Sequence, residues 1–461
     1  MLFSSYEFIF AFLPFTFLLY FYLNHKNLTQ LAKLFLVFAS LFFYSWWNIV
    51  YLPLILLSMF FNYAIGSFLT KGHAFSKKTV LSFGITSNLA LLGYFKYSDF
   101  FIENINLLTD SEIGLLHLAL PLAISFFTFQ QIAYLVDSYK NETKEYDFLN
   151  YAIFVTYFPQ LIAGPIVHHK EMMPQFASKD TKMLHYSNIS LGLFIFSIGL
   201  FKKIVIADTF AVWATAGFDT TTSLQFFEAW ATSLSYTFQL YFDFSGYTDM
   251  AIGASLLFNI RLPINFNSPY KATNIQDFWR RWHITLSRFL KDYIYIPLGG
   301  NRKGEVRTYA NLFMTFLLGG IWHGAGWTFI FWGFMHGAAL VIHRGWNQLG
   351  FKMPTILAWF LTFNFVNISW VFFRAKEWED ALKVLRGMFD FSDFSFGLNS
   401  LEAFIIVVGF MIVLGFKNSM YYYQHKFTFT ASQAFIMIVA LSISIYAIRL
   451  RNSSEFLYFN F

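Results

Sequence analysis

The sequence has 461 residues, of which 57% are hydrophobic, only 13% are charged and none is cysteine. Soluble domains carry about 25% charged residues, so this composition excludes a soluble globular protein and predicts an all-α polytopic membrane protein. The lack of cysteine excludes disulfides, thiolate nucleophiles and S-acyl relays on this chain.

Long apolar runs recur along the whole chain, and a run of about 20 apolar residues spans the ~30 Å hydrocarbon core of a bilayer. Clear examples are 8–23, 34–57, 115–136, 191–206 and 401–416. We expect about eleven transmembrane helices, packed as one membrane-embedded domain over residues 1–461. The first run lacks the basic region and the small-residue cleavage site of a signal peptide, so we interpret it as the first span.

Positive charge is concentrated in the segment 261–307, which holds nine basic and three acidic residues and therefore accounts for the whole net charge of +6. Cytoplasmic loops are enriched in Lys and Arg, which places this segment in the cytoplasm, together with the loop that carries Lys71, Lys77 and Lys78. The acidic stretch 99–112 suits the outer side. The positive-inside bias alone is the simpler explanation of the segment. Its length and its interleaved aromatic residues favour a site for a phosphate-bearing ligand or for anionic lipid head groups.

The basic segment also contains local helix signals. Asn274 or Thr273 can cap a helix over 275–293, with Asp277 in its first turn. The PLGG sequence at 297–300 is expected to end this helix.

The next segment bears on the depth of one histidine. Residues 308–318 precede Gly319-Gly320, and a helix of that length rises about 17 Å, roughly half of the bilayer core. We therefore expect His323 near mid-depth, where a water-lined cavity would make it reachable from both faces.

Further along, the segment 375–390 places Trp378, Leu382, Leu385 and Phe389 at helical spacing. This pattern predicts an amphipathic helix that lies on the membrane surface. Its charge is balanced, and we assign it no catalytic role.

Four of the eleven histidines lie in or beside apolar segments: His283, His323, His336 and His343. Burying an ionisable side chain costs free energy, so each is a functional candidate, although a helix–helix hydrogen bond is the alternative. The glycines around His323 permit close approach of a ligand or of another backbone, which favours a functional role there. His336 follows thirteen residues later, about 220° around an unbroken helix, so we expect it to pack and hydrogen-bond elsewhere.

Two carboxylates, Asp243 and Asp249, lie in an otherwise apolar stretch, YFDFSGYTDMAIG. A buried carboxylate needs a partner, and an Arg or His of the basic segment is the natural one. Both an orienting role and a helix-pairing role fit this pattern.

Other catalytic patterns are missing from the sequence. No histidine is followed five positions later by Asp, and the motifs H-E-x-x-H, G-x-S-x-G and the P-loop do not occur. No histidine cluster has metal-ligand spacing, so we expect no metal.

Three stretches carry a resemblance to a known family: SYTFQLYFDFSGYTDMAIG, DFWRRWHITLSRFLKDYIYIPLGGNRKG and LLGGIWHGAGWTFIFWGFMHG. They resemble the membrane-bound O-acyltransferase (MBOAT) family, and most closely its bacterial branch of peptidoglycan and alginate O-acetylation proteins, which is related to the teichoic-acid D-alanylation protein. The similarity extends to 159–176, to 199–208 and to the C-terminal FLYFNF, and thus covers essentially the whole chain.

The resemblance implies a ring of transmembrane helices, with additional re-entrant and interfacial helices, around a thinned centre crossed by a tunnel. It implies that His323 of the W-H-G motif is catalytic and that His283 is a second site residue. It leaves Trp322, Asp243 and Asp249 as supporting candidates.

The implied reaction takes acetyl from cytoplasmic acetyl-CoA, with no permanently bound cofactor and no nucleic acid. His323 would act as general base on the acceptor hydroxyl, and His283 would position the acyl group or polarise its carbonyl; a transient acetyl-histidine is an alternative. The phosphates of the donor would dock on Arg280, Arg281, Lys291, Arg302 and Lys303.

Similar proteins of the bacterial inner membrane pass the acetyl group to a periplasmic SGNH-type O-acetyltransferase that modifies a polysaccharide. The expected acceptor is peptidoglycan, and alginate or another exopolysaccharide is the alternative. A transporter is a rival class, because intramembrane charges and broken helices also mark transport pathways, but the chain has no evident internal repeat. A membrane scaffold that docks a cell-wall enzyme through FLYFNF is the third class.

Overall fold

The computed structural model describes residues 1–71, 76–143, 147–392, 397, 399–450 and 456–457, and over these residues it contains helices and no strand. The first half comprises α1 (Leu13–His25), α2 (Thr29–Ser45), α3 (Leu52–Lys71), α4 (Lys77–Thr109), α5 (Ile124–Tyr139), α6 (Phe148–Thr156), α7 (Phe158–Leu161), α8 (His169–Ala177), α9 (Tyr186–Phe201) and α10 (Asp208–Thr215). The expected all-α class is confirmed.

The second half comprises α11 (Phe226–Leu257), α12 (Ile275–Trp279), α13 (Ile284–Leu290), α14 (Glu305–His323), α15 (Trp327–Gln348), α16 (Thr355–Arg374), α17 (Trp378–Met388), α18 (Ser400–Gly415), α19 (Ser419–Gln424) and α20 (Ala431–Leu450). Wider π-helical turns extend several of these helices: Glu7–Phe12 before α1, Lys202–Ala207 between α9 and α10, Ala216–Thr220 after α10, and Lys291–Tyr295 after α13.

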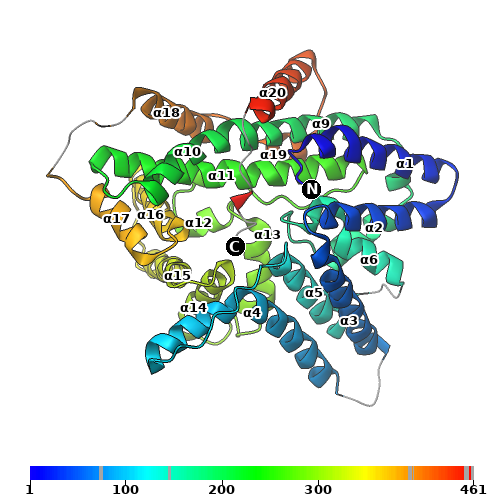
Figure 1. Cartoon of the computed structure of the whole chain (residues 1–461), viewed down its shortest axis with the longest axis horizontal. Helices are drawn as coiled ribbons and strands as arrows, with labels where there is room; N and C mark the ends of the chain where they lie inside the picture. The colour runs from blue at the N-terminus through cyan, green and yellow to red at the C-terminus, as the bar shows by residue number, and fades with distance from the viewer. Residues whose placement is uncertain (72–75, 144–146, 393–396, 398, 451–455, 458–461) are drawn as a thin grey trace.

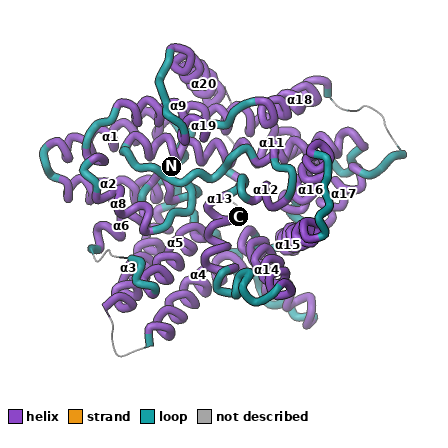
Figure 2. The backbone as a smooth tube through the Cα atoms, turned by 180° about the vertical axis from the view of Figure 1, so that it is seen from behind, coloured by secondary structure: helices purple, strands orange, loops and turns teal. Residues whose placement is uncertain are grey.

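The helices surround a central region in which α12 and α13 lie (Figure 1). The view from behind has the same arrangement, with α14 and α4 on one side of the centre and α9 and α11 on the other (Figure 2). The short central helices are thus enclosed by long peripheral ones, as in the expected ring.

Six helical segments of the described part of the chain are long and apolar enough to cross a membrane: Glu7–His25, Ile49–Lys71, Tyr186–Thr220, Thr355–Arg374, Ser400–Gln424 and Ala431–Leu450. These segments make the chain a multi-pass membrane protein. The expected total of about eleven spans stays a prediction.

The long helix α11 forms the core of the molecule, and all but a few of its residues are buried. It packs closely against α9 because both helices carry glycine where they cross. A Cβ added to Gly199 would lie 2.6 Å from the carbonyl oxygen of Gly246. Small residues that allow such close backbone approach are a common basis of helix packing in membranes.

The helix expected over 275–293 is broken, so that prediction is wrong in its extent. The Asn274 side chain does accept a hydrogen bond from the backbone N–H of Asp277, at 2.8 Å, as expected of a cap. However, α12 ends after five residues, and α13 begins only after His283, whose φ of 42° is incompatible with a right-handed helix. The break places His283 at the N-terminus of α13.

The expected half-span ending at Gly319-Gly320 is also wrong. Helix α14 continues through both glycines to His323, and its 19 residues rise about 28 Å. Gly320 serves close packing against α15, because a Cβ on it would lie 2.5 Å from the carbonyl oxygen of Phe329, whereas Gly319 faces Leu290 of α13. His323 therefore does not follow a half-span, and its position is set by the end of a full-length helix.

An amphipathic helix forms within the segment 375–390, as α17 (Trp378–Met388), and its position on the membrane surface stays a prediction. Its buried face is not the predicted one, because Trp378 and Phe389 are exposed. Its buried residues Ala381, Val384, Gly387 and Met388 pack towards α11 and α16. Its N-terminus is closed by a reciprocal cap between Glu377 and Asp380.

Candidate active site

His323 is the last residue of α14, and only 3% of its surface is exposed. Its imidazole packs against three aromatic rings, with centroid separations of 4.9 Å to Trp322, 5.0 Å to Trp332 and 5.1 Å to Phe373. The helix ends here because Gly324 is extended. The W-H-G motif thus puts an imidazole at a helix end inside an aromatic cage.

His283 lies at the break between α12 and α13 and is completely buried. Its ring stands edge-on to Phe244 of α11, with centroids 4.8 Å apart. A chain of rings connects the two histidines: Trp282, next to His283, lies 4.9 Å from Trp370, which stacks 5.8 Å from Trp332 beside His323 (ring centroids). The fold therefore brings two segments that are forty residues apart into one aromatic cluster, and the roles of the two histidines stay predictions.

Asn265 fixes the protonation pattern of His283. The amide oxygen of Asn265 accepts from the backbone N–H of Thr285 at 3.2 Å and from the Thr285 hydroxyl at 2.9 Å. An amide NH₂ cannot accept from a backbone N–H, so the atom facing Thr285 is the oxygen Oδ1. This same oxygen lies 3.1 Å from Nδ1 of His283, so Nδ1 carries the proton and Nε2 of the neutral ring carries the lone pair. In this form Nε2 accepts a proton but cannot donate one to a carbonyl.

Indole N–H groups are the donors that surround the imidazoles. Trp322, Trp332 and Trp370 are buried, and their Nε1 atoms have no hydrogen-bond partner within the described part of the chain. Trp332 and Trp370 stack with centroids 5.8 Å apart, next to His323. Buried indoles normally find a partner, so these N–H groups are available to a substrate oxygen.

His336 has a structural role, as expected. Its Nδ1 accepts from the Trp279 indole at 3.2 Å, and its Nε2 lies 3.0 Å from the Ser369 hydroxyl. The turn 324–326 folds α15 back along α14, so the unbroken helix assumed from the sequence does not exist. As a result the Trp332 ring packs against two imidazoles, with centroid separations of 4.7 Å to His336 and 5.0 Å to His323.

The carboxylates Asp243 and Asp249 pair with lysines of the α9–α10 segment, and the expected partners from the basic segment are wrong. Lys202 donates to Asp249 at 2.6 Å, and Lys203 lies 2.7 Å from Asp243. Asp243 also accepts from the backbone N–H of Leu457, at 2.9 Å. The pairs connect α11 to the end of α9 and hold the C-terminal segment. The sequence did contain a signal for these partners, namely the two adjacent lysines in the apolar stretch GLFKK.

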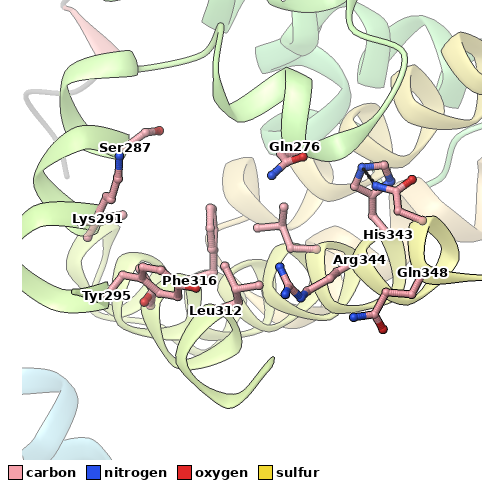
Figure 3. Close-up of a pocket in the computed structure, with 13 residues that line it drawn as sticks. Gln276, Ser287, Lys291, Tyr295, Leu312, Phe316, His343, Arg344 and Gln348 are labelled. Carbon is pink, nitrogen blue, oxygen red and sulfur yellow. Dashed lines mark hydrogen bonds between the residues drawn. The ribbon is translucent and has the colours of Figure 1, made fainter. Parts of the chain in front are cut away.

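A pocket of about 490 Å³ opens beside the two short central helices (Figure 3). Lys291 lines it on one side, and Arg344 and His343 of α15 line it on the other. Further lining residues are Gln276, Ser287, Leu290, Leu312, Thr315 and Phe316. Ser287 lies about one helical turn after His283, and Phe316 about two turns before His323. The pocket thus lies beside the helices that carry His283 and His323, and neither histidine lines it.

The five basic residues predicted to bind phosphate do not all lie at the pocket. Lys291 lines the pocket, whereas Arg281 forms a salt bridge with Asp277 at 2.9 Å. The other three, Arg280, Arg302 and Lys303, are exposed and do not line it. Arg344 was not predicted, because its place at the pocket depends on how α15 packs.

Lys96 of α4 was also missed. Its ammonium donates to the backbone carbonyls of Trp322 and His323. A single lysine within the apolar run NLALLGYFKYSDFF was the available signal.

The family model described as MBOAT, membrane-bound O-acyltransferase family, matches residues 9–376. The chain belongs to this family. As an MBOAT protein it is a membrane acyltransferase.

Relatives of this MBOAT protein fall into three groups. It is 53% identical to a peptidoglycan O-acetyltransferase of Helicobacter pylori, over 100% of this chain and 98% of that protein. It is 39% identical to a probable alginate O-acetylase of Pseudomonas aeruginosa, over 92% and 83%. It is 28% identical to a teichoic acid D-alanyltransferase of Bacillus subtilis, over 55% and 69%.

Proposed function

We propose that this chain moves acetyl groups from cytoplasmic acetyl-CoA across the bacterial inner membrane for O-acetylation of a cell-wall polysaccharide, with peptidoglycan as the final acceptor. Full-length similarity to a peptidoglycan O-acetyltransferase at 53% identity supports the acceptor. The observation that carries the chemistry is a pair of buried imidazoles, His283 and His323, at the ends of two helices, α13 and α14, that also line a pocket with a basic rim.

The pocket suits a phosphorylated thioester. Lys291 at the rim can bind phosphate oxygens through charge-assisted hydrogen bonds. Arg344 can add the N–H groups of Nη1, because its Nε and Nη2 already donate to Glu305. Leu290, Leu312 and Phe316 offer an apolar wall to the pantetheine arm and to the acetyl group. The thioester carbonyl would reach the histidines by passing Phe316 and Ser287.

The transfer step uses His323 as general base. The imidazole takes the proton of the acceptor hydroxyl while the hydroxyl oxygen attacks the thioester carbonyl carbon. The C–S bond then breaks, the protonated imidazole returns its proton to the leaving sulfur, and the products are an O-acetyl ester and CoA thiol. The single proton of the attacking hydroxyl goes to His323, so His283, protonated at Nδ1, would accept at Nε2 a hydrogen bond from another N–H or O–H group of the substrates. The indole N–H of Trp332 donates to the oxyanion.

On the outer side, a periplasmic partner acetyltransferase of the SGNH type would receive the acetyl group and transfer it to the glycan. The probable alginate O-acetylases at 39% identity support alginate or another exopolysaccharide as the second candidate acceptor.

The test replaces His323 with Ala in cells that express the chain and measures base-labile O-acetyl esters on purified peptidoglycan. His425→Ala is the matched control, because His425 is an exposed histidine that bonds only its own helix, at Tyr421. At equal membrane levels, the proposal predicts loss of esters with His323→Ala and normal esters with His425→Ala. Wild-type ester content with His323→Ala contradicts it. Esters that are lost from an exopolysaccharide but not from peptidoglycan identify the second acceptor.

A further inference from the structure

Lys96 lies within the 33-residue helix α4, and its ammonium reaches the end of the helix that carries His323. Its Nζ donates to the carbonyl oxygens of Trp322 at 2.6 Å and of His323 at 3.0 Å, and to the Ser125 hydroxyl at 3.4 Å. A lysine ammonium has three N–H donors. All three therefore have acceptors, and two of these acceptors belong to the W-H-G motif itself.

The next residue on α4 extends the same contact. The Tyr97 hydroxyl donates to the carbonyl oxygen of Ile321 at 2.6 Å. The last carbonyls of an α-helix have no partner within the helix, and α14 ends abruptly because Gly324 is extended. Three consecutive carbonyls, from Ile321 to His323, are thus capped by side chains of a different helix.

The charge of Lys96 indicates a role beyond packing. Within the described part of the chain, no carboxylate lies within salt-bridge distance of its Nζ. A cation without an acidic partner is costly inside a membrane protein, and an apolar side chain of similar length would fill the same space at a lower cost. The ammonium instead faces the negative end of the α14 dipole and the face of the Trp322 indole, at 5.7 Å.

We propose that Lys96 is the positioning residue of the catalytic centre. It fixes the last turn of α14 and thereby sets the direction in which the His323 imidazole and the Trp322 indole point. This inference rests on the proposed role of His323 as general base. A misplacement of about 1 Å costs roughly 10²-fold in rate, so loss of the ammonium lowers turnover without preventing donor binding.

A lysine elsewhere in the chain provides the matched control. Lys383 of α17 donates to the carbonyls of Phe218 and Thr221, both at 2.8 Å, at the end of the π-helical turn Ala216–Thr220. It therefore also caps a helix end with two bonds, but the residues it holds do not contact His323. Comparison with Lys383→Met distinguishes the general effect of losing a helix-capping lysine from the specific effect of losing Lys96.

The experiment uses the full-length purified protein with its periplasmic partner. It measures CoA thiol release as a function of acetyl-CoA concentration, together with amide hydrogen exchange of the peptide that covers residues 321–326. We expect Lys96→Met to lower kcat roughly 10²-fold with little change in KM, and to accelerate exchange in that peptide. Lys96→Arg, which retains charged donors, should recover part of kcat, and Lys383→Met should keep the wild-type value.

Three results would overturn the inference: a kcat for Lys96→Met close to wild type, unchanged exchange over 321–326, or an equal loss of kcat in Lys383→Met. A loss seen only in KM would assign Lys96 to donor binding and contradict positioning. If the wild-type protein consumes no acetyl-CoA, the proposed function fails. The exchange measurement still decides whether Lys96 holds the turn.

Discussion

The indole of Trp332 stands at 85° to the imidazole of His323, with ring centroids 5.0 Å apart. Trp332 is on α15 and His323 ends α14, so the contact depends on the tight hairpin formed by these two helices. The indole N–H has no partner within the described residues. It can therefore donate a hydrogen bond to a negative charge that develops on the substrate.

Replacing Trp332 with Phe tests this donor. Phe retains an aromatic ring against His323 but removes the N–H, so we expect kcat to fall about 10²-fold, as for loss of one oxyanion donor, with the protein still folded. Steady-state CoA release and a thermal melt would measure the two effects. A kcat equal to that of the wild type would show that the N–H has no part in the reaction.

The tautomer of His283 gives a second prediction. Asn265→Leu removes the oxygen that holds the Nδ1 proton and lets the ring turn or change tautomer. Proton-transfer groups contribute about 10²–10⁴-fold, and we expect a loss near the lower limit, because the imidazole itself remains. Asn364→Leu is the control, since Asn364 is half-buried and its side chain donates to the Phe360 carbonyl of its own helix. Equal activities of the two variants would contradict the assignment.

Loss of a buried ion pair is expected to lower the free energy of unfolding, independently of any role in catalysis. Lys203→Met leaves the carboxylate of Asp243 buried without its cation, and breaking such a pair costs about 3–5 kcal/mol. Lys170→Met removes the partner of Glu142 in an exposed pair at 3.2 Å, which is worth about 0–1 kcal/mol. Thermal unfolding in detergent compares them. Similar melting temperatures for both variants would mean that the pair does not hold α11 to the end of α9.

Helix packing at Gly320 predicts a coupled loss of stability and activity. An added Cβ would lie 2.8 Å from the Cα of Gly333 as well as 2.5 Å from the Phe329 carbonyl, so Gly320→Ala must push α14 from α15. Overpacking costs about 1–3 kcal/mol and shifts His323. Gly345→Ala, where a Cβ meets nothing within 4 Å, should be neutral or stabilising by up to about 1 kcal/mol. A fully active, stable Gly320→Ala protein would contradict this account of the hairpin.

The class of fold follows from the sequence, because it rests on strong local signals, and the role of His323 in the site stays a prediction. Apolar runs fix the membrane class through the thickness of the bilayer. His323 stands out as an imidazole among glycines and aromatics, and the W-H-G motif assigns it a family role. The Asn274 cap and the presence of a helix within 375–390 rest on equally local signals, and both were predicted correctly.

The errors concern contacts between segments that are distant in sequence. The break at His283 depends on Asn265, which binds Thr285 and the His283 ring from outside the helix. The continuation of α14 through Gly319-Gly320 accompanies the close packing of Gly320 against α15, which the local sequence does not show. The pairing of Asp243 with Lys203, and of the His323 carbonyl with Lys96, likewise required the arrangement of whole helices.

The central claim is that His323 drives acetyl transfer from acetyl-CoA, and it is tested most directly with purified protein. The measurement is CoA thiol release from acetyl-CoA by the full-length chain with its periplasmic partner, for the wild type and for His323→Asn. We predict steady release by the wild type and, because a general base contributes about 10²–10⁴-fold, a loss of at least about 10²-fold in His323→Asn. Undiminished release by a folded His323→Asn protein would contradict the account.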